Sequence, residues 1–107
     1  MSEDFSVEWP DDGARLGGRL TFATCAAVYR ELERHGLDRP VEGPVDLSGV
    51  SRVDSAGLAL LLEWQARQAA AGRRLSLRQA PDSLLRLAQL ANAAELLDLG
   101  GRNGAAS

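Results

Sequence analysis

Asp54 and Ser55 have the clearest potential for chemistry, since they place a carboxylate and a hydroxyl directly before a long apolar segment. Both residue types accept hydrogen bonds from the free N–H groups at the start of a helix. A hydroxyl at that place can also be phosphorylated, because the free N–H groups and the helix dipole stabilise the phosphate. The sequence therefore leaves two interpretations of Ser55 open, a helix cap and a phospho-acceptor.

The patterns of common enzyme sites are missing from the sequence. All 12 basic residues are arginine, which excludes a phosphate-binding loop that ends in lysine and a hydroxyl residue. Val53 stands where a nucleophile elbow around Ser55 would need its first glycine. The single histidine, His35, lies in a preceding helix and provides no dedicated base for Ser55. We therefore expect a protein that is not an enzyme.

Metal and cofactor sites are not indicated either. Cys25 is the single cysteine, so the chain has neither an internal disulfide nor the ligands of a Cys/His zinc site. We expect Cys25 to be a small core residue and His35 to lie near a helix C-terminus. No cofactor is expected.

Composition restricts the class of protein. With 107 residues and 45% hydrophobic content, the chain has room for one core. The net charge of −3 and the scattered arginines do not favour nucleic-acid binding. The acidic residues 1–4 are not followed by an apolar run, so we expect no signal peptide. No apolar run in the sequence reaches the roughly 20 residues of a membrane span. We expect a cytoplasmic protein without direct membrane insertion.

Hydrophobic periodicity predicts the elements that position Asp54 and Ser55. Strands are predicted over residues 5–9, 14–20, 45–48 and 73–78, and helices over 22–35, 58–71 and 81–91, with a short helical turn over 94–99. The first two strands form an antiparallel pair at one sheet edge. The strands on either side of the central helix are parallel, because a crossover joins them. This order predicts an α/β fold, a mixed four-stranded sheet with three or four helices packed on it.

The first predicted helix has one apolar face, and Gly36 follows it as a C-cap. We expect this face to lie on the sheet, and its members are Phe22, Cys25, Ala26, Tyr29 and Leu32. Asn92 is predicted to end the last long helix in the left-handed conformation.

The central segment resembles a known family. A hydrophobic strand ending in Asp46-Leu47-Ser48, followed by Asp54-Ser55-x-Gly57-Leu58 at a helix start, is similar to the STAS domain. This family includes bacterial anti-sigma-factor antagonists and the cytoplasmic tails of anion transporters. The continuation over residues 52–62 is closer to the small cytoplasmic STAS subunit (MlaB-like) of the bacterial Mla phospholipid-transport ABC system. The resemblance implies a STAS domain over residues 1–99. The small and polar residues over 100–107 predict a disordered tail.

Two functions follow from this resemblance. The first is a non-catalytic accessory subunit that binds the cytoplasmic ATPase of an ABC transporter. That transporter moves phospholipid between the bacterial membranes and maintains outer-membrane lipid asymmetry, so the subunit would lie peripheral to the inner membrane. The alternative is a phosphorylatable anti-sigma-factor antagonist that binds a serine kinase, with Ser55 as phospho-acceptor. The antagonists have serine or threonine at this position, and the Mla branch usually has threonine.

The helix after Ser55 indicates a protein interface. It is apolar on all sides, which predicts a second cover beyond the sheet. We expect a partner protein on the stripe of Leu60 and Trp64, or a weak homodimer when the partner is missing. The alternative is that Trp64 folds over the edge of the sheet, and the pattern leaves open which stripe of the helix over 58–71 faces the sheet. Gly57 in the first turn suggests a close approach by another group. The predicted partner-binding residues are Ser51, Arg52, Asp54, Ser55, Ala56, Gly57, Leu60 and Trp64.

Overall fold

The computed structural model describes residues 4–41 and 43–97. The predicted tail over 100–107 lies outside these residues. The elements in chain order are β1 (Phe5–Glu8), β2 (Ala14–Leu20), α1 (Cys25–His35), β3 (Val45–Val53), α2 (Ser55–Ala70), β4 (Leu77–Arg78), α3 (Asp82–Leu90) and α4 (Ala94–Leu97).

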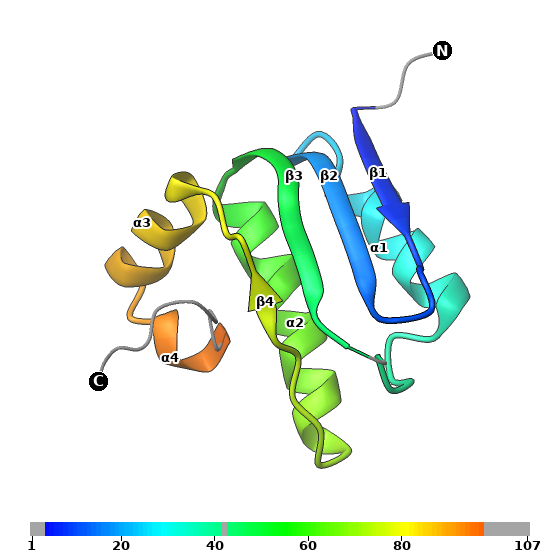
Figure 1. Ribbon diagram of the computed structural model, residues 1–107. Helices are drawn as coiled ribbons and strands as arrows, with labels where there is room; N and C mark the ends of the chain where they lie inside the picture. Colours follow the sequence, from blue (N-terminus) through cyan, green and yellow to red (C-terminus); the bar gives the residue numbers. More distant parts are fainter. Residues whose placement is uncertain (1–3, 42, 98–107) are drawn as a thin grey trace.

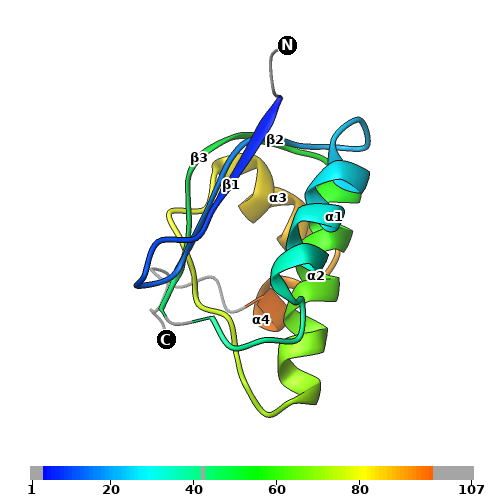
Figure 2. The same ribbon diagram turned by 90° about the vertical axis from the view of Figure 1, so that its right-hand side faces the viewer.

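The four strands form one mixed sheet in the order β1-β2-β3-β4. The pair β1–β2 is antiparallel, and the pairs β2–β3 and β3–β4 are parallel. Figures 1 and 2 show that α1 and α2 cover one face of the sheet, while α3 and α4 lie beside its β4 edge. The predicted α/β fold, with its antiparallel edge pair and its parallel crossover around α2, is therefore confirmed.

Two strands differ in length from the predicted ones. Strand β3 extends beyond the predicted 45–48, because its second half pairs with β2 as far as Leu20↔Val53. The polar turn expected after that strand is instead part of it. Strand β4 is shorter than the predicted 73–78, since only Leu77–Arg78 pairs with β3. Both differences arise from pairing between distant segments, which local alternation does not determine.

Helix α1 begins later than predicted and presents a different face to the sheet. The N–H groups of Thr24 and Cys25 both donate to the carbonyl of Thr21, at 2.9 Å, so a turn precedes the helix. Phe22 lies in that turn and is 85% exposed. Its predicted place on the sheet is therefore wrong, as is that of the exposed Ala26.

The buried residues of α1 are Val28 and Leu32, and Cys25 is half-buried against the core. The C-terminal end of the helix agrees with the prediction. His35 lies in the last turn, and Gly36 ends the helix with φ of 88°. Asn92 also adopts the predicted left-handed conformation, with φ of 56°.

Helix α2 is covered by the rest of the chain on three sides, and an exposed stripe that includes Ala59, Glu63 and Ala66 faces solvent. It contacts β2 and β3 on one side, α1 on one flank, and α3 and α4 on the other (Figure 1). Trp64 is 1% exposed and Leu60 is 6% exposed. The prediction that these two residues form an exposed partner-binding stripe is therefore wrong. The second cover that an all-round apolar helix needs is supplied by the chain's own helices.

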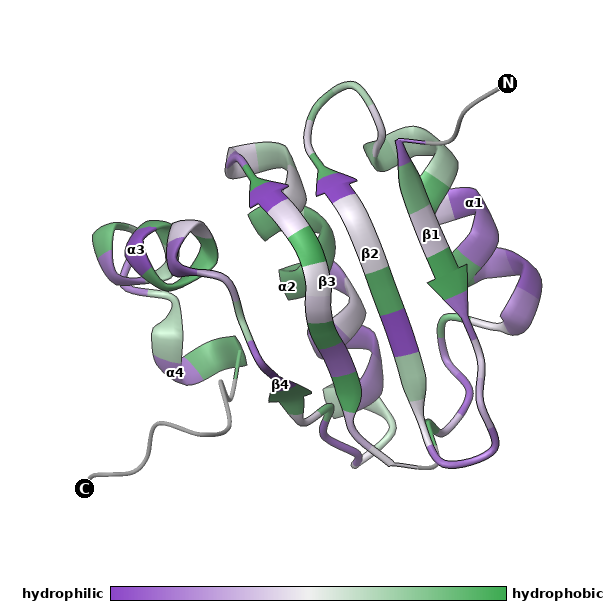
Figure 3. Cartoon of the chain, turned by 45° about the horizontal axis from the view of Figure 1, so that its top comes forward, coloured by the Kyte–Doolittle hydropathy of each residue, from purple (hydrophilic) through white to green (hydrophobic). Residues whose placement is uncertain are grey.

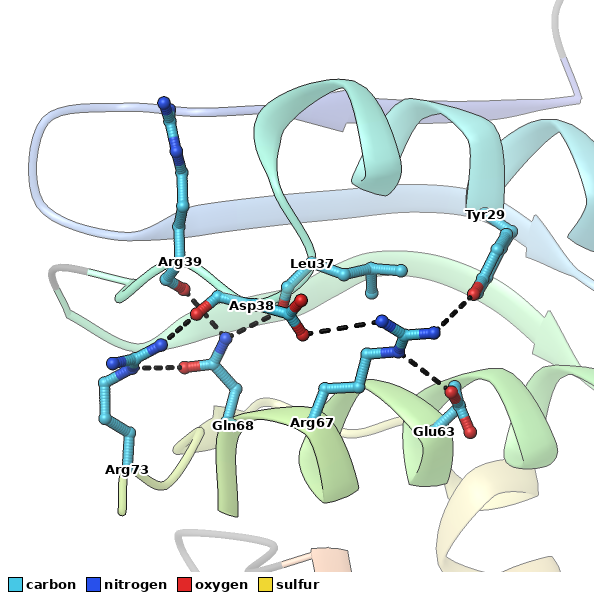
Figure 4. A network of polar contacts seen from close by, with 8 residues as sticks. All are labelled: Tyr29, Leu37, Asp38, Arg39, Glu63, Arg67, Gln68 and Arg73. Atoms are coloured by element: carbon cyan, nitrogen blue, oxygen red, sulfur yellow. Dashed lines mark hydrogen bonds and ion pairs between the residues drawn. The ribbon is translucent and has the colours of Figure 1, made fainter. Parts of the chain in front are cut away.

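Polar contacts hold the connection after α1 against the C-terminal half of α2 (Figure 4). The buried Gln68 side-chain amide donates to the carbonyls of Leu37 and Arg39, at 2.9 and 2.8 Å. Arg67 forms an ion pair with Asp38 at 3.5 Å. These contacts attach an irregular segment to a regular helix, because buried carbonyls need hydrogen-bond partners.

Candidate functional site

The candidate site lies where the carboxyl ends of β2 and β3 meet at one edge of the sheet. The two strands are parallel and pair up to Leu20↔Val53. The N–H of Asp54 then donates to the carbonyl of Leu20 at 3.2 Å. The hydroxyl of Ser51 donates to the carbonyl of Gly18 at 3.3 Å. The β2–α1 turn and the β3–α2 junction are thus held side by side.

A single carboxylate joins these two segments. Oδ1 of Asp54 accepts hydrogen bonds from the N–H groups of Ala56 at 2.9 Å and Gly57 at 3.2 Å, which caps α2. Oδ2 accepts from the N–H of Phe22 at 3.0 Å. The bond from Phe22 is the main cause that lowers the pKa of Asp54, and the bonds from Gly57 and Ala56 lower it further against the effect of burial.

Gly57 lets the first turn of α2 lie close to the end of β2, as its position in the sequence suggested. A Cβ atom at this residue would lie 2.1 Å from the carbonyl oxygen of Leu20. Any side chain would therefore separate the first turn of α2 from the end of β2. The absence of a side chain lets the Asp54 carboxylate reach both segments at once.

Ser55 is the first residue of α2, and its side chain is exposed. Because Asp54 caps the helix, the interpretation of Ser55 as the cap is wrong. The Ser55 hydroxyl makes no hydrogen bond with any other described residue. It is consequently available to a group outside the chain, on a backbone that Asp54 keeps in place.

The structure divides the predicted partner-binding residues into two groups. Those at this sheet edge are Ser51, Arg52, Asp54, Ser55, Ala56 and Gly57. Leu60 and Trp64 lie in the core instead. Of the group at the edge, Ser51, Arg52 and Ser55 are exposed and can contact a partner directly. Asp54 and Gly57 act on the shape of the site through the backbone.

Two exposed residues of this edge, Phe22 and Arg19, were not among the predicted ones. Phe22 was missed because its spacing matches the apolar face of α1. The signal that could have found it is the Thr21–Thr24 spacing, since threonines form local turns with the backbone. Here the hydroxyl of Thr24 donates to the carbonyl of Arg19 at 2.6 Å and accepts from the N–H of Thr21 at 3.1 Å.

Within the described residues, no group of three or more histidine, cysteine, aspartate or glutamate side chains gathers in a way that could hold a metal ion. Over the same part of the chain, no helix combines the length and the apolar character that crossing a membrane requires.

Replacing Asp54 with alanine is expected to lower the free energy of unfolding by about 2 kcal/mol. The change removes a helix cap and a charge-assisted bond to the neighbouring turn. Asp54→Asn is the matched control, because asparagine also caps helices. It should lose less than half of the unfolding free energy that Asp54→Ala loses. Urea denaturation measures both values. Equal stability of Asp54→Ala and the wild type would contradict the bridging role.

The same carboxylate gives a prediction for pH. The folded-state pKa of Asp54 is lowered below the unfolded value of about 3.9. Its contribution to stability is therefore complete above that value and is lost as the pH falls through the folded pKa. The difference in unfolding free energy between wild type and Asp54→Asn should shrink as the pH falls below about 4. The lowered pKa of Asp46 is common to both proteins and cancels.

The order of elements, the mixed sheet and the polar junction before α2 define an α/β domain of the STAS type. A crystal structure of a candidate anti-sigma factor antagonist from Thermotoga maritima has the same fold, with a TM-score of 0.67 and 18% sequence identity. The match covers 85% of this chain and 80% of that one.

The model of the family described as "Mlab, STAS domain" matches residues 7–98, and the chain belongs to this family. Its members are typically binding domains without catalytic activity. Comparison with curated protein sequences finds no match.

Proposed function

We propose that the protein is a non-catalytic accessory subunit that binds the ATPase of a phospholipid-transport ABC complex. Membership of the MlaB-type family supports the choice of partner. The observation that carries the choice of surface is the Ser55 hydroxyl, which is exposed and makes no hydrogen bond with another described residue. Through this partner the subunit lies on the cytoplasmic side of the inner membrane.

The geometry of the β3–α2 junction favours binding. The Asp54 carboxylate holds the first turn of α2 and the neighbouring turn of Phe22 through three N–H groups, so little conformational entropy is lost when a partner docks. The two residues directly after Ser55, Ala56 and Gly57, have small side chains. A partner can therefore approach the first turn of α2 closely, and its contact with Ser55 is sensitive to side-chain size.

A phosphorylatable antagonist of an anti-sigma factor remains the second candidate function. The free serine hydroxyl at a helix N-terminus supports it, because a phosphate there would be stabilised by N–H groups and the helix dipole. The fold it shares with the Thermotoga maritima protein fits both functions. Neighbouring genes discriminate between them: an ATPase and a permease favour the first, a serine kinase and a phosphatase the second.

Substitutions at Ser55 test the proposed surface. Ser55→Arg places a long cation at the positive end of α2 and inside a close contact. It is expected to raise the Kd for the ATPase subunit more than about 100-fold, while the circular dichroism spectrum and cooperative unfolding are retained. Ser55→Ala, which removes no cap, should change stability by less than about 0.5 kcal/mol and weaken binding only in part. Titration calorimetry measures the Kd values.

Ala70→Arg is the matched control, because Ala70 is exposed at the opposite end of the same helix. It should bind the ATPase like the wild type. If Ser55→Arg also binds like the wild type, the junction is not the contact surface. Ser55→Asp separates the two functions: a phosphorylation-controlled antagonist should release its kinase, whereas a transporter subunit has no such response.

A further inference from the structure

Two arginines lie side by side at the same sheet edge as Ser55. Arg19 of β2 and Arg52 of β3 are paired in the register, and the hydrophilic ends of these strands are adjacent in Figure 3. Both side chains are exposed, and neither takes part in an ion pair or hydrogen bond with another described residue. Like charges directly opposite one another in a sheet are unfavourable. Among the described residues, no carboxylate forms an ion pair with either arginine to offset this repulsion.

The other end of the same two strands shows the contrast. Arg15 of β2 forms ion pairs with Glu8 at 2.9 Å and with Asp46 at 3.6 Å. Asp46 is the register partner of Arg15, as Arg52 is of Arg19. The sheet thus neutralises its cation at the amino end of β2 and leaves two cations unneutralised at the carboxyl end. An anionic surface outside the chain would relieve that repulsion.

Phe22 adds an apolar element to this edge. Its side chain is 85% exposed, although a phenylalanine gains more from burial than almost any other residue. Its backbone is fixed by the 3.0 Å bond to Asp54, the residue directly before Ser55. An exposed aromatic ring on a rigid turn has the properties of a binding anchor, because little freedom is lost when it enters a pocket.

We propose that Phe22 and the Arg19–Arg52 pair are recognition elements on either side of the Ser55 junction. They define the partner's surface as an apolar pocket, which receives Phe22, bordered by aspartate or glutamate side chains that face the two arginines. This inference rests on the proposed function, since the partner is the same ATPase subunit. An anionic membrane is a poorer match, because lipid surfaces attract clusters of 4–8 basic residues and the chain carries a net charge of −3.

Titration calorimetry with the purified ATPase subunit tests the proposal. Phe22→Ala is expected to raise the Kd by about 20-fold or more. The double variant Arg19→Glu/Arg52→Glu should raise it about 100-fold or more, because it sets carboxylates against carboxylates. The Kd of the wild type should also rise between about 0.05 M and about 0.5 M NaCl, and that of the double variant should fall, because salt screens an attraction in the first and a repulsion in the second.

Two exposed residues of α3 provide matched controls. Leu90→Ala removes an apolar side chain that is 80% exposed, and Arg86→Glu reverses an exposed charge. Both should bind the ATPase like the wild type. Circular dichroism confirms the fold of every variant. A flotation assay with vesicles that contain anionic lipid is the comparison arm, and we expect no binding there.

The outcomes separate this inference from the function on which it rests. If wild type fails to bind the ATPase, the proposed function is wrong, and the inference fails with it. If Ser55→Arg abolishes binding but Phe22→Ala and the double arginine variant bind like the wild type, only the inference is overturned. Arginine-dependent binding to the vesicles would also overturn it, since the edge would then recognise lipid.

Discussion

Trp64→Ala is expected to lower the free energy of unfolding by about 3–5 kcal/mol, the usual range for removing a buried tryptophan. Trp64 is 1% exposed in α2. It packs edge-on against Trp9, with ring centroids 6.1 Å apart, and Trp9 in turn stacks on His35 at 4.4 Å. The alanine variant leaves a cavity at the buried end of this aromatic group, beside Trp9. Urea denaturation, with the same m value for both proteins, measures the loss.

Leu90→Ala is the control, because it removes a large apolar side chain that is already in contact with water. Its effect on the free energy of unfolding should stay within about 0.5 kcal/mol. If Trp64→Ala is as stable as the wild type but has lost affinity for the partner, then Trp64 does not lie in the core. That outcome would restore the exposed stripe that the sequence pattern predicted.

Gln65→Leu is expected to cost about 3 kcal/mol of stability, although it exchanges a polar core residue for an apolar one. The Gln65 amide donates to the carbonyls of Leu75 and Leu97, at 3.0 and 3.2 Å. Its oxygen accepts from the N–H of Leu75 at 2.8 Å. Leucine would leave three buried backbone groups without partners, and each such group costs about 1–3 kcal/mol.

Gln89→Leu is the control for this prediction, since Gln89 is exposed on α3 and has the same chemistry. Its unfolding free energy should remain near that of the wild type. Thermal unfolding followed by circular dichroism ranks the two variants. A Gln65→Leu protein as stable as the wild type would show that the backbone groups find other partners or that Gln65 does not join α2 to Leu75 and Leu97.

The sequence predicted the elements whose signals are local. Strand β2 has the predicted limits, because Gly13 and the polar turn before it mark the start, and Thr21 begins the turn after it. Gly36 and Asn92 end their helices as predicted, since both adopt backbone conformations with positive φ. The parallel arrangement around α2 was also predictable, because a crossover helix requires it.

The remaining features depend on packing between distant segments. Phe22 has the spacing of a core residue and Trp64 that of an exposed one, yet the structure reverses both. Periodicity shows that α2 is apolar on all sides, but it does not show whether helices of the same chain or a partner cover the helix. The register that places Arg19 beside Arg52 likewise arises only when β2 and β3 pair.

The Asp54 carboxylate also has a consequence for motion. The amide of Phe22 and those of Ala56 and Gly57 belong to different segments, but all three depend on one side chain. Rotation of that side chain away from the amides would break all three bonds at once, so the turn and the helix start would loosen together and not separately. A partner that holds the start of α2 in place would therefore also hold the turn of Phe22, and the ordering entropy would be lost once for both segments. A contact at Ser55 alone would then order both the start of α2 and the turn that carries Phe22.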